Sequence, residues 1–313
     1  MGLTIGEPTG IGPEIILKAI EKLSEKNIIV IYGNFPPTSK TNSLIEISKI
    51  SEINKFPDRN KFWIQIHPEE KFEFGNPSKM SGIAAFETIK IAGKDALNGE
   101  LNAIVTGPIS KSHIQLTYPD FIGHTEFFAK QANSKNFVMS FFSKKINIAL
   151  LTTHLALNEV SKNLSIDKIE NQIKLIHKAL RKYLKFSCPK LALLAVNPHC
   201  GENGAFGNEE QKILIPVIKN LAKEGIFIEG PFSADTFFTK KYQKYDMIIS
   251  PYHDQGLIPF KMLSFGSGVN VTFGLPYIRT SVDHGTAFDI AGKNIASEKS
   301  LLAAFKLADK MMR

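Results

Sequence analysis

Short apolar runs alternate with helical periodicities along most of the chain. The runs are rich in β-branched and aliphatic side chains and are too short for typical helices, so they predict largely buried strands. These strands are expected at residues 27–32, 62–66, 103–106, 146–152, 191–196 and 247–250.

The intervening segments contain amphipathic helices. Apolar residues recur at three- and four-residue steps after Ser81 and again after Ser165, which suits an N-cap. The first apolar face consists of Ile83, Phe86, Ile89 and Leu97, and the second of Ile166, Ile169, Ile173, Ile176, Leu180 and Leu184. Strands that alternate with helices predict an α/β protein with a mainly parallel or mixed sheet.

No linker is visible between domains. The stretches 35–43 and 56–60 are typical of loops, and the sequence contains no internal repeat or low-complexity segment. The 313 residues suffice for one large or two moderate domains. We therefore expect two lobes built from interleaved segments.

The composition indicates the type of protein and its cellular compartment. With 43% hydrophobic and 22% charged residues, the chain is neither a disordered protein nor a collagen-like fibre. No apolar run approaches the roughly 20 residues of a membrane span, and the start lacks a secretory signal pattern. Cys188 and Cys200 are too few for a disulfide framework. These features predict a cytoplasmic protein without membrane contact.

The formal charge of +8 raises the question of a nucleic-acid partner. The basic residues are scattered, however, and the densest groups, at 181–185 and 240–244, fall at expected helix ends. No zinc-finger spacing or long basic run is present. We expect no nucleic-acid partner, and a mild positive field also favours anionic metabolites.

Polar residues gather in a few turn-rich segments, most of which follow a predicted strand. Strand ends deliver the ligand-binding loops of α/β sheets, so these segments are candidates for chemistry. They are GEPTGIGPE at 6–14, TGPISK at 106–111, GHTE at 123–126, NPHCGENGAFG at 197–207, YHDQGLIPFK at 252–261 and DHGTAFDIAGK at 283–293.

His154, His199 and His253 each follow an apolar strand. Their separations exclude a local metal motif, but imidazoles at strand ends can converge across a sheet edge. Three imidazoles hold a divalent ion and leave it an open position for a substrate oxygen. Three unrelated loop histidines are the alternative, which spacing alone does not exclude.

Two further groups allow a functional and a plain interpretation. Gly10, Gly12 and Pro13 precede a helix near Glu14, where backbone amides can bind an anion or where the glycines serve a tight connection. Lys261, Asn270 and Arg279 lie in a glycine-rich tract. A lysine and an arginine together can bind a phosphate or a carboxylate, and the alternative is that they belong to a solvated basic surface. Neither G-x-G-x-x-G nor a P-loop is present.

Taken in order, the motif segments resemble the PdxA family of 4-hydroxythreonine-4-phosphate dehydrogenases. The similar segments run from residue 6 to residue 293, and DHGTAFDIAGK also looks like the cofactor-binding stretch of isocitrate and isopropylmalate dehydrogenases. The departures are Glu7 in place of the commoner aspartate, Cys200 in place of alanine, and a short segment at 34–80.

The resemblance implies an α/β, two-lobed isocitrate/isopropylmalate-dehydrogenase-like fold with the active-site cleft between the lobes. Residues 1–110 and 266–313 are expected to form the first α/β lobe, on the cofactor side. Residues 111–265 are expected to form the second α/β lobe, on the metal and dimer side.

Residue by residue, the family motifs assign roles to positions of this chain. His154, His199 and His253 match metal ligands, for zinc, cobalt, nickel or magnesium. The matched substrate contacts are His124, Thr125, Lys261, Asn270 and Arg279. Gly285 and Asp289 are the expected NAD(P) contacts, with NAD and NADP left undecided.

The implied reaction is metal-dependent NAD(P) oxidation of 4-phosphooxy-L-threonine with decarboxylation to 3-amino-2-oxopropyl phosphate, in pyridoxal phosphate (vitamin B6) biosynthesis. Lys261 would stabilise the enolate, and the general base is Asp235, Lys111 or metal-bound water. The family also implies a homodimer with a shared active site, to which the partner supplies His253. Two alternatives stay open: a dehydrogenase of 4-phosphothreonate or 4-phosphoerythronate, and a non-catalytic phosphometabolite- or metal-binding module.

Overall fold

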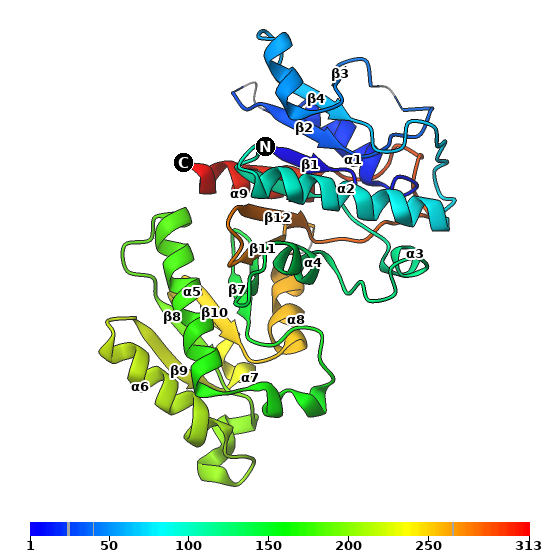
Figure 1. The fold of residues 1–313 in the computed structure, drawn as a ribbon. Coiled ribbons are helices and arrows are strands. Elements are labelled where there is room, and N and C mark those ends of the chain that lie inside the picture. The colour runs from blue at the N-terminus through cyan, green and yellow to red at the C-terminus, as the bar shows by residue number, and fades with distance from the viewer. Residues whose placement is uncertain (24–25, 40, 265) are drawn as a thin grey trace. The chain divides into compact units, whose positions relative to one another are not determined.

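The computed structural model describes residues 1–23, 26–39, 41–264 and 266–313. The chain divides into two compact units (Figure 1). Unit 1 consists of Met1–Ser134 and Leu275–Met312, and unit 2 of Lys135–Gly274. The two segments of unit 1 therefore flank unit 2 in the sequence.

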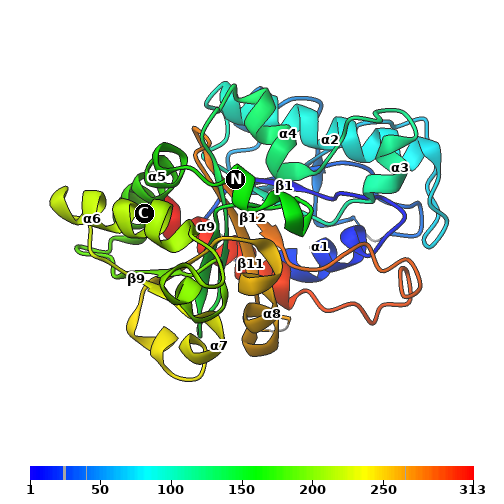
Figure 2. The same cartoon turned by 90° about the horizontal axis from the view of Figure 1, so that it is seen from below.

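Unit 1 contains parallel strands in the order β3-β4-β2-β1-β5-β12. The strands are β1 (Gly2–Thr4), β2 (Ile29–Tyr32), β3 (Ile45–Glu46), β4 (Lys61–Ile64), β5 (Ala103–Thr106) and β12 (Ile278–Val282). The helices are α1 (Gly12–Ile20), α2 (Lys79–Leu97), α3 (Lys111–Gln115), α4 (His124–Gln131) and α9 (Lys299–Met312). Figure 2 shows α2, α3 and α4 on one side of these strands and α1 and α9 on the other. Helices on both faces explain why β1, β2, β5 and β12 are buried along their whole length.

Unit 2 contains a mixed sheet in the order β11-β6-β7-β10-β8-β9. The strands are β6 (Val138–Phe142), β7 (Asn147–Leu150), β8 (Leu191–Leu194), β9 (Ile228–Phe232), β10 (Met247–Ser250) and β11 (Val269–Phe273). β6 is antiparallel to both β11 and β7, and the other pairs are parallel. The helices are α5 (Ile166–Leu184), α6 (Ile215–Lys223), α7 (Ala234–Phe237) and α8 (His253–Ser264). The predicted α/β class with a mixed sheet is confirmed.

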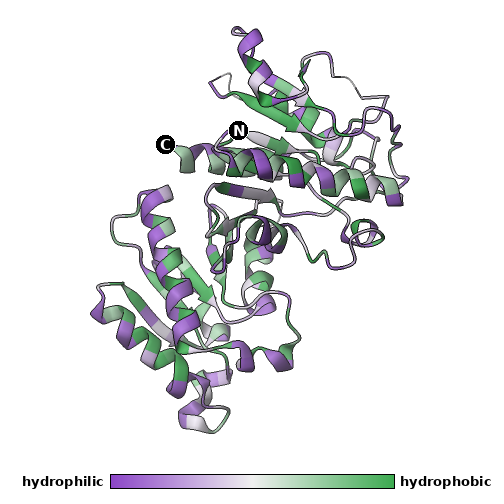
Figure 3. Cartoon of the chain, in the orientation of Figure 1, coloured by the Kyte–Doolittle hydropathy of each residue, from purple (hydrophilic) through white to green (hydrophobic). Residues whose placement is uncertain are grey.

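The periodic helices follow the predicted patterns closely. α5 begins directly after Ser165 and buries Ile169, Ile173 and Ile176 completely. Figure 3 shows polar and apolar residues alternating along this helix. α2 begins earlier than predicted, because Ser78 rather than Ser81 is its N-cap. The Ser78 hydroxyl accepts from the Ser81 amide at 3.1 Å, and the Ser81 hydroxyl accepts from the Ser78 amide at 2.9 Å, which is a capping box.

The unit boundaries differ from the lobes expected from the sequence. Residues 111–134 belong to unit 1, because α3 and α4 pack on α2. Residues 266–274 belong to unit 2, because β11 pairs along its length with β6. Within the described residues, no helix is both long and apolar enough to cross a membrane.

Candidate active site

A buried arginine organises the candidate site of unit 1. Arg279 lies on β12 and is only 2% exposed. Its Nη2 donates to Thr106 Oγ1 at 2.7 Å, and its Nη1 donates to Thr125 Oγ1 at 3.4 Å. Burial lowers the pKa of Arg279 to about 10, so the guanidinium stays charged at neutral pH. A buried cation surrounded by hydroxyl groups is suited to bind an anion.

The N-terminus of α4 brings further predicted residues to this arginine. A Cβ added at Gly123 would lie 3.4 Å from Lys111 Nζ, so glycine leaves room for the lysine beside the first turn. His124 and Thr125 begin the helix. Burial, and then the charges of Arg279 and Lys111, hold the pKa of His124 well below its ordinary 6.5, which keeps the imidazole neutral.

We call Lys111, His124, Thr125 and Arg279 the Arg279 cluster. Each was predicted from the sequence, and the structure brings the four together within unit 1. His124 Nε2 is buried without a hydrogen-bond partner among the described residues, so it is available to a ligand. Two cations, a neutral imidazole and a hydroxyl can bind a phosphate or a carboxylate.

Two neighbours of the cluster were missed in the sequence. Thr106 holds the guanidinium, and Glu126 favours its charged form. Both lie inside segments singled out by their polarity, Thr106 at the end of a strand and Glu126 in GHTE. The position of Thr106 beside Arg279 depends on the pairing of β12 with β5, which the sequence pattern does not contain, and Glu126 lies on α4.

The glycine-rich turn before α1 serves packing rather than an exposed anion site. Ile11 N donates to Thr286 O at 2.9 Å and Gly10 N donates to Glu7 O at 3.1 Å, so both amides are already engaged. A Cβ at Gly12 would lie 2.1 Å from Ile5 O. Of the two interpretations of this segment, the structure therefore favours the tight connection.

The predicted cofactor contacts lie in the loop between β12 and α9. Gly285 and Asp289 are both exposed, and a Cβ at Gly285 would meet no atom within 4 Å. In the same loop, His284 Nε2 is buried without a hydrogen-bond partner among the described residues. An exposed backbone beside an unsatisfied imidazole is compatible with a dinucleotide, whose binding here remains a prediction.

In unit 2, two predicted metal ligands are neighbours. β7 and β10 are parallel, with Leu150 paired to Ser250, and His154 and His253 follow these paired ends. Their ring centroids are 6.0 Å apart. They line a cavity of about 340 Å³ with Tyr252, Leu155 and other residues. His253 Nδ1 lies 2.7 Å from Asp254 Oδ1, which leaves Nε2 for a ligand.

His199 lies in a strained turn after β8. His199, Cys200 and Glu202 have φ values of 51°, 55° and 41°, and Gly201 and Asn203 are also left-handed. Non-glycine residues rarely adopt this conformation, and strained segments of this kind cluster at functional sites.

The carboxylate of Glu210 supports this turn. Glu210 is 1% exposed, and its Oε1 accepts from the amides of Val196 and Asn197 at 2.8 Å each. Its Oε2 accepts from Asn197 Nδ2 at 3.0 Å.

His154, His199 and His253 have the right type of donor for a divalent ion, because imidazole nitrogen is a common ligand of such ions. Among residues 1–23, 26–39, 41–264 and 266–313, however, no group of three or more His, Cys, Asp or Glu side chains could hold a metal ion within one chain. The structure therefore brings His154 and His253 together but does not assemble the predicted triad.

The remaining predicted residues are dispersed over unit 2. Asp235 lies on α7, where the Ser233 hydroxyl donates to it at 2.7 Å; this bond and then the Thr236 amide lower the pKa of Asp235. Lys261 is exposed on α8, and Asn270 lies on β11. Asn270 Oδ1 is buried without a hydrogen-bond partner among the described residues. A lowered pKa makes Asp235 a weak general base.

Comparison with known proteins decides the family. The family model described as "Pyridoxal phosphate biosynthetic protein PdxA" matches residues 20–308. The chain belongs to the PdxA family. One PdxA relative, the 4-hydroxythreonine-4-phosphate dehydrogenase of Sulfurihydrogenibium sp. (strain YO3AOP1), is 41% identical over 318 residues, with 100% of this chain and 98% of the relative covered. The D-threonate 4-phosphate dehydrogenase of Salmonella typhimurium is 37% identical, with 98% and 97% covered.

Solved structures agree with this assignment. A 4-hydroxythreonine-4-phosphate dehydrogenase from Klebsiella pneumoniae has a TM-score of 0.81 and 33% identity, covering 100% of this chain and 97% of that chain. An isocitrate dehydrogenase from Methylococcus capsulatus has a TM-score of 0.54 at 14% identity, covering 98% and 84%. The second match shows the fold alone, and it confirms the predicted isocitrate-dehydrogenase-like fold of this PdxA enzyme.

Proposed function

We propose that this PdxA enzyme oxidises and decarboxylates 4-phosphooxy-L-threonine with NAD(P)+, giving 3-amino-2-oxopropyl phosphate in the biosynthesis of pyridoxal phosphate. The observation that carries the proposal is the Arg279 cluster. A charged guanidinium that is 2% exposed, beside Lys111 and a neutral His124, suits a phosphorylated substrate.

Each member of the cluster has a distinct part in binding. Arg279 offers a planar fork to phosphate oxygens, and Thr106 and Thr125 fix its orientation. His124 donates a hydrogen bond without adding charge, because its pKa is lowered. Lys111 adds a second cation at the open edge of the cluster. Of the candidate general bases, Asp235 is weakened because its pKa is lowered.

His154, His199 and His253 would hold the divalent ion, zinc, cobalt or magnesium. Bound there, it would supply Lewis acidity for oxidation of a hydroxyl group and for the enolate that follows. Gly285 and Asp289 would hold NAD(P)+, which would supply a hydride acceptor when bound. Asp254 orients the His253 ring, and Lys261 and Asn270 would contact the part of the substrate beyond the phosphate.

We further propose a homodimer in which the partner's His253, rather than the His253 that lies beside His154 in the same chain, completes each metal site, because the described residues of one chain do not assemble three ligands. Large apolar side chains around the histidines support this arrangement. Leu155 and Leu157 line the cavity of His154 and His253 and are 43% and 71% exposed. Ile258 and Met262 on α8 are 59% and 80% exposed. Exposed apolar residues next to functional groups mark interaction surfaces.

The proposal is tested by measuring NADH formation with a substrate panel. 4-Phosphooxy-L-threonine should be oxidised with release of carbon dioxide, and its dephosphorylated analogue should be a far poorer substrate. Preference for D-threonate 4-phosphate would favour the second candidate, which the Salmonella relative supports. Metal and phosphate binding without any turnover would instead indicate a non-catalytic module.

The shared site is tested by mixing inactive His154→Ala and His253→Ala subunits. If the two ligands come from different chains, each heterodimer regains one intact site. Random pairing then restores roughly a quarter of all sites. Complete subunit exchange without recovered activity would contradict the shared site.

A further inference from the structure

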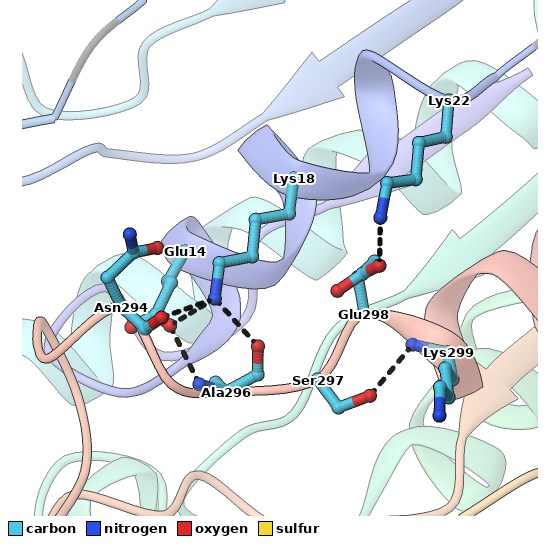
Figure 4. A network of polar contacts seen from close by, with 8 residues as sticks. All are labelled: Glu14, Lys18, Lys22, Asn294, Ala296, Ser297, Glu298 and Lys299. Carbon is cyan, nitrogen blue, oxygen red and sulfur yellow. Dashed lines mark hydrogen bonds and ion pairs between the residues drawn. The ribbon is translucent and has the colours of Figure 1, made fainter.

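The segment that follows the predicted cofactor loop is fastened to α1 by backbone hydrogen bonds with Glu14 and Lys18, which form an ion pair on that helix (Figure 4). Glu14 Oε1 accepts from Ala296 N at 2.8 Å and from Lys18 Nζ at 2.9 Å. Lys18 Nζ also donates to Asn294 O at 3.0 Å and to Ala296 O at 2.8 Å. We call this arrangement the Glu14–Lys18 clamp.

The clamp satisfies the lysine completely. An ammonium group has three N–H donors, and Lys18 directs them at a carboxylate and two backbone carbonyls. Glu14 is 8% exposed and lies in the first turn of α1, four residues before Lys18, so both side chains share one helix face. A surface ion pair without such backbone contacts would contribute little.

The loop needs external support because of its backbone. Ala287 and Asn294 have φ values of 43° and 59°, which non-glycine residues rarely adopt. The clamp grips the carbonyl of Asn294, one of these left-handed residues. At the other end, Ser300 Oγ accepts from Asp283 N at 3.2 Å, and Ile11 N donates to Thr286 O. Gly285 and Asp289 lie between these anchors.

We infer that Glu14 and Lys18 are positioning residues that hold the 283–298 segment in the conformation that binds the nicotinamide coenzyme. This inference rests on the proposed function, which assigns the coenzyme to Gly285 and Asp289. The clamp lies outside the Arg279 cluster. Loss of the clamp should therefore weaken binding of the coenzyme and leave binding of the phosphorylated substrate almost unchanged.

The test uses Lys18→Met, which keeps the aliphatic stem, and the milder Glu14→Gln, which keeps the size and an acceptor for Ala296 N. Lys55→Met is the matched control, because Lys55 pairs with Glu52 at the same 2.9 Å but on an exposed turn of unit 1. Calorimetric titration gives the Kd for NAD+, steady-state kinetics gives both KM values, and hydrogen exchange reports on residues 283–298.

We expect Lys18→Met to raise Kd and KM for NAD+ about tenfold, with kcat and the KM for the phosphorylated substrate changed less than about twofold. Exchange should accelerate at 283–298 but not in unit 2, which separates loss of the clamp from global unfolding. Glu14→Gln should show a smaller effect in the same direction. Lys55→Met should resemble the wild type.

Two failures are distinguishable. Unchanged exchange and unchanged NAD+ affinity in Lys18→Met would overturn the clamp even if the wild type is an active dehydrogenase. A wild-type enzyme that binds no dinucleotide would overturn the proposed function and the coenzyme part of this inference, whereas exchange would still decide whether the clamp holds the segment.

Discussion

Removal of the Glu210 carboxylate should both destabilise unit 2 and weaken metal binding. In Glu210→Ala the amides of Val196 and Asn197 lose their common acceptor, which each contacts at 2.8 Å. An unsatisfied buried donor costs about 1–3 kcal/mol, and these two residues are half-buried, so we expect about 2–3 kcal/mol in total. For cooperative unfolding of a chain of 313 residues, that corresponds to a fall in Tm of roughly 3–5 °C.

The same substitution releases the left-handed turn that carries His199. Residues that orient a metal ligand typically change metal affinity about 10- to 100-fold, and we expect a loss in that range. Thermal unfolding gives the stability, and calorimetric titration with Co²⁺ or Zn²⁺ gives the affinity. Glu210→Gln, which keeps an acceptor, should lose only about 1 kcal/mol.

Glu224→Ala is the control for this experiment, because Glu224 is an exposed carboxylate of unit 2 paired with Lys174. It should stay within about 0.5 kcal/mol of the wild type. Wild-type stability in Glu210→Ala would refute the structural reasoning. A destabilised variant with undiminished metal affinity would refute the link between this turn and the metal.

Three further outcomes are expected. Arg279→Lys should lower kcat/KM for the phosphorylated substrate by at least about tenfold; an equal loss with the dephosphorylated analogue would contradict a phosphate contact. Folding lowers the pKa of His124 below its ordinary 6.5, so the unfolded chain binds more protons in that window. Stability should therefore fall as the pH drops below about 6.5, and less steeply in His124→Gln, measured by denaturant unfolding. Leu157→Asp should shift the protein from dimer to monomer in light scattering, and an unchanged dimer would exclude this surface.

The sequence predicts β2, β4, β5, β7, β8 and β10 for a physical reason, whereas it misses β1, β3, β6, β9, β11 and β12. Parallel strands covered on both faces are apolar throughout, so the runs that form β5 and β8 stand out from their surroundings. β12 was missed because it carries Arg279, Thr280 and Ser281 although it is buried. Its hydroxyls are satisfied by distant partners: Thr280 donates to Ala304 O at 3.0 Å, and Ser281 to Thr106 O at 3.3 Å. Those partners exist only in the folded chain.

The start of α8 shows how turn-forming residues mislead. Gly256 and Pro259 predict a loop, yet both lie inside a helix. A Cβ at Gly256 would lie 2.9 Å from Ile148 and 3.0 Å from Ser250, so glycine is required where the helix crosses the sheet closely. Hydrophobic periodicity cannot distinguish a glycine that permits close packing from one that ends an element.

Sheet order determines which strand-end residues can meet, and this explains why only two of the three candidate metal ligands are neighbours. In the sheet of unit 2, β10 lies between β7 and β8, although in the sequence β8 comes between β7 and β10. His154 and His253 are therefore neighbours despite their separation along the chain. His199 follows β8, on the other side of β10, and its direction is set by a left-handed turn. That turn depends on a carboxylate eleven residues further on, Glu210, whose contacts no local pattern could reveal. Residue type thus identified the three candidate ligands, whereas their arrangement follows from strand order and from one buried side chain.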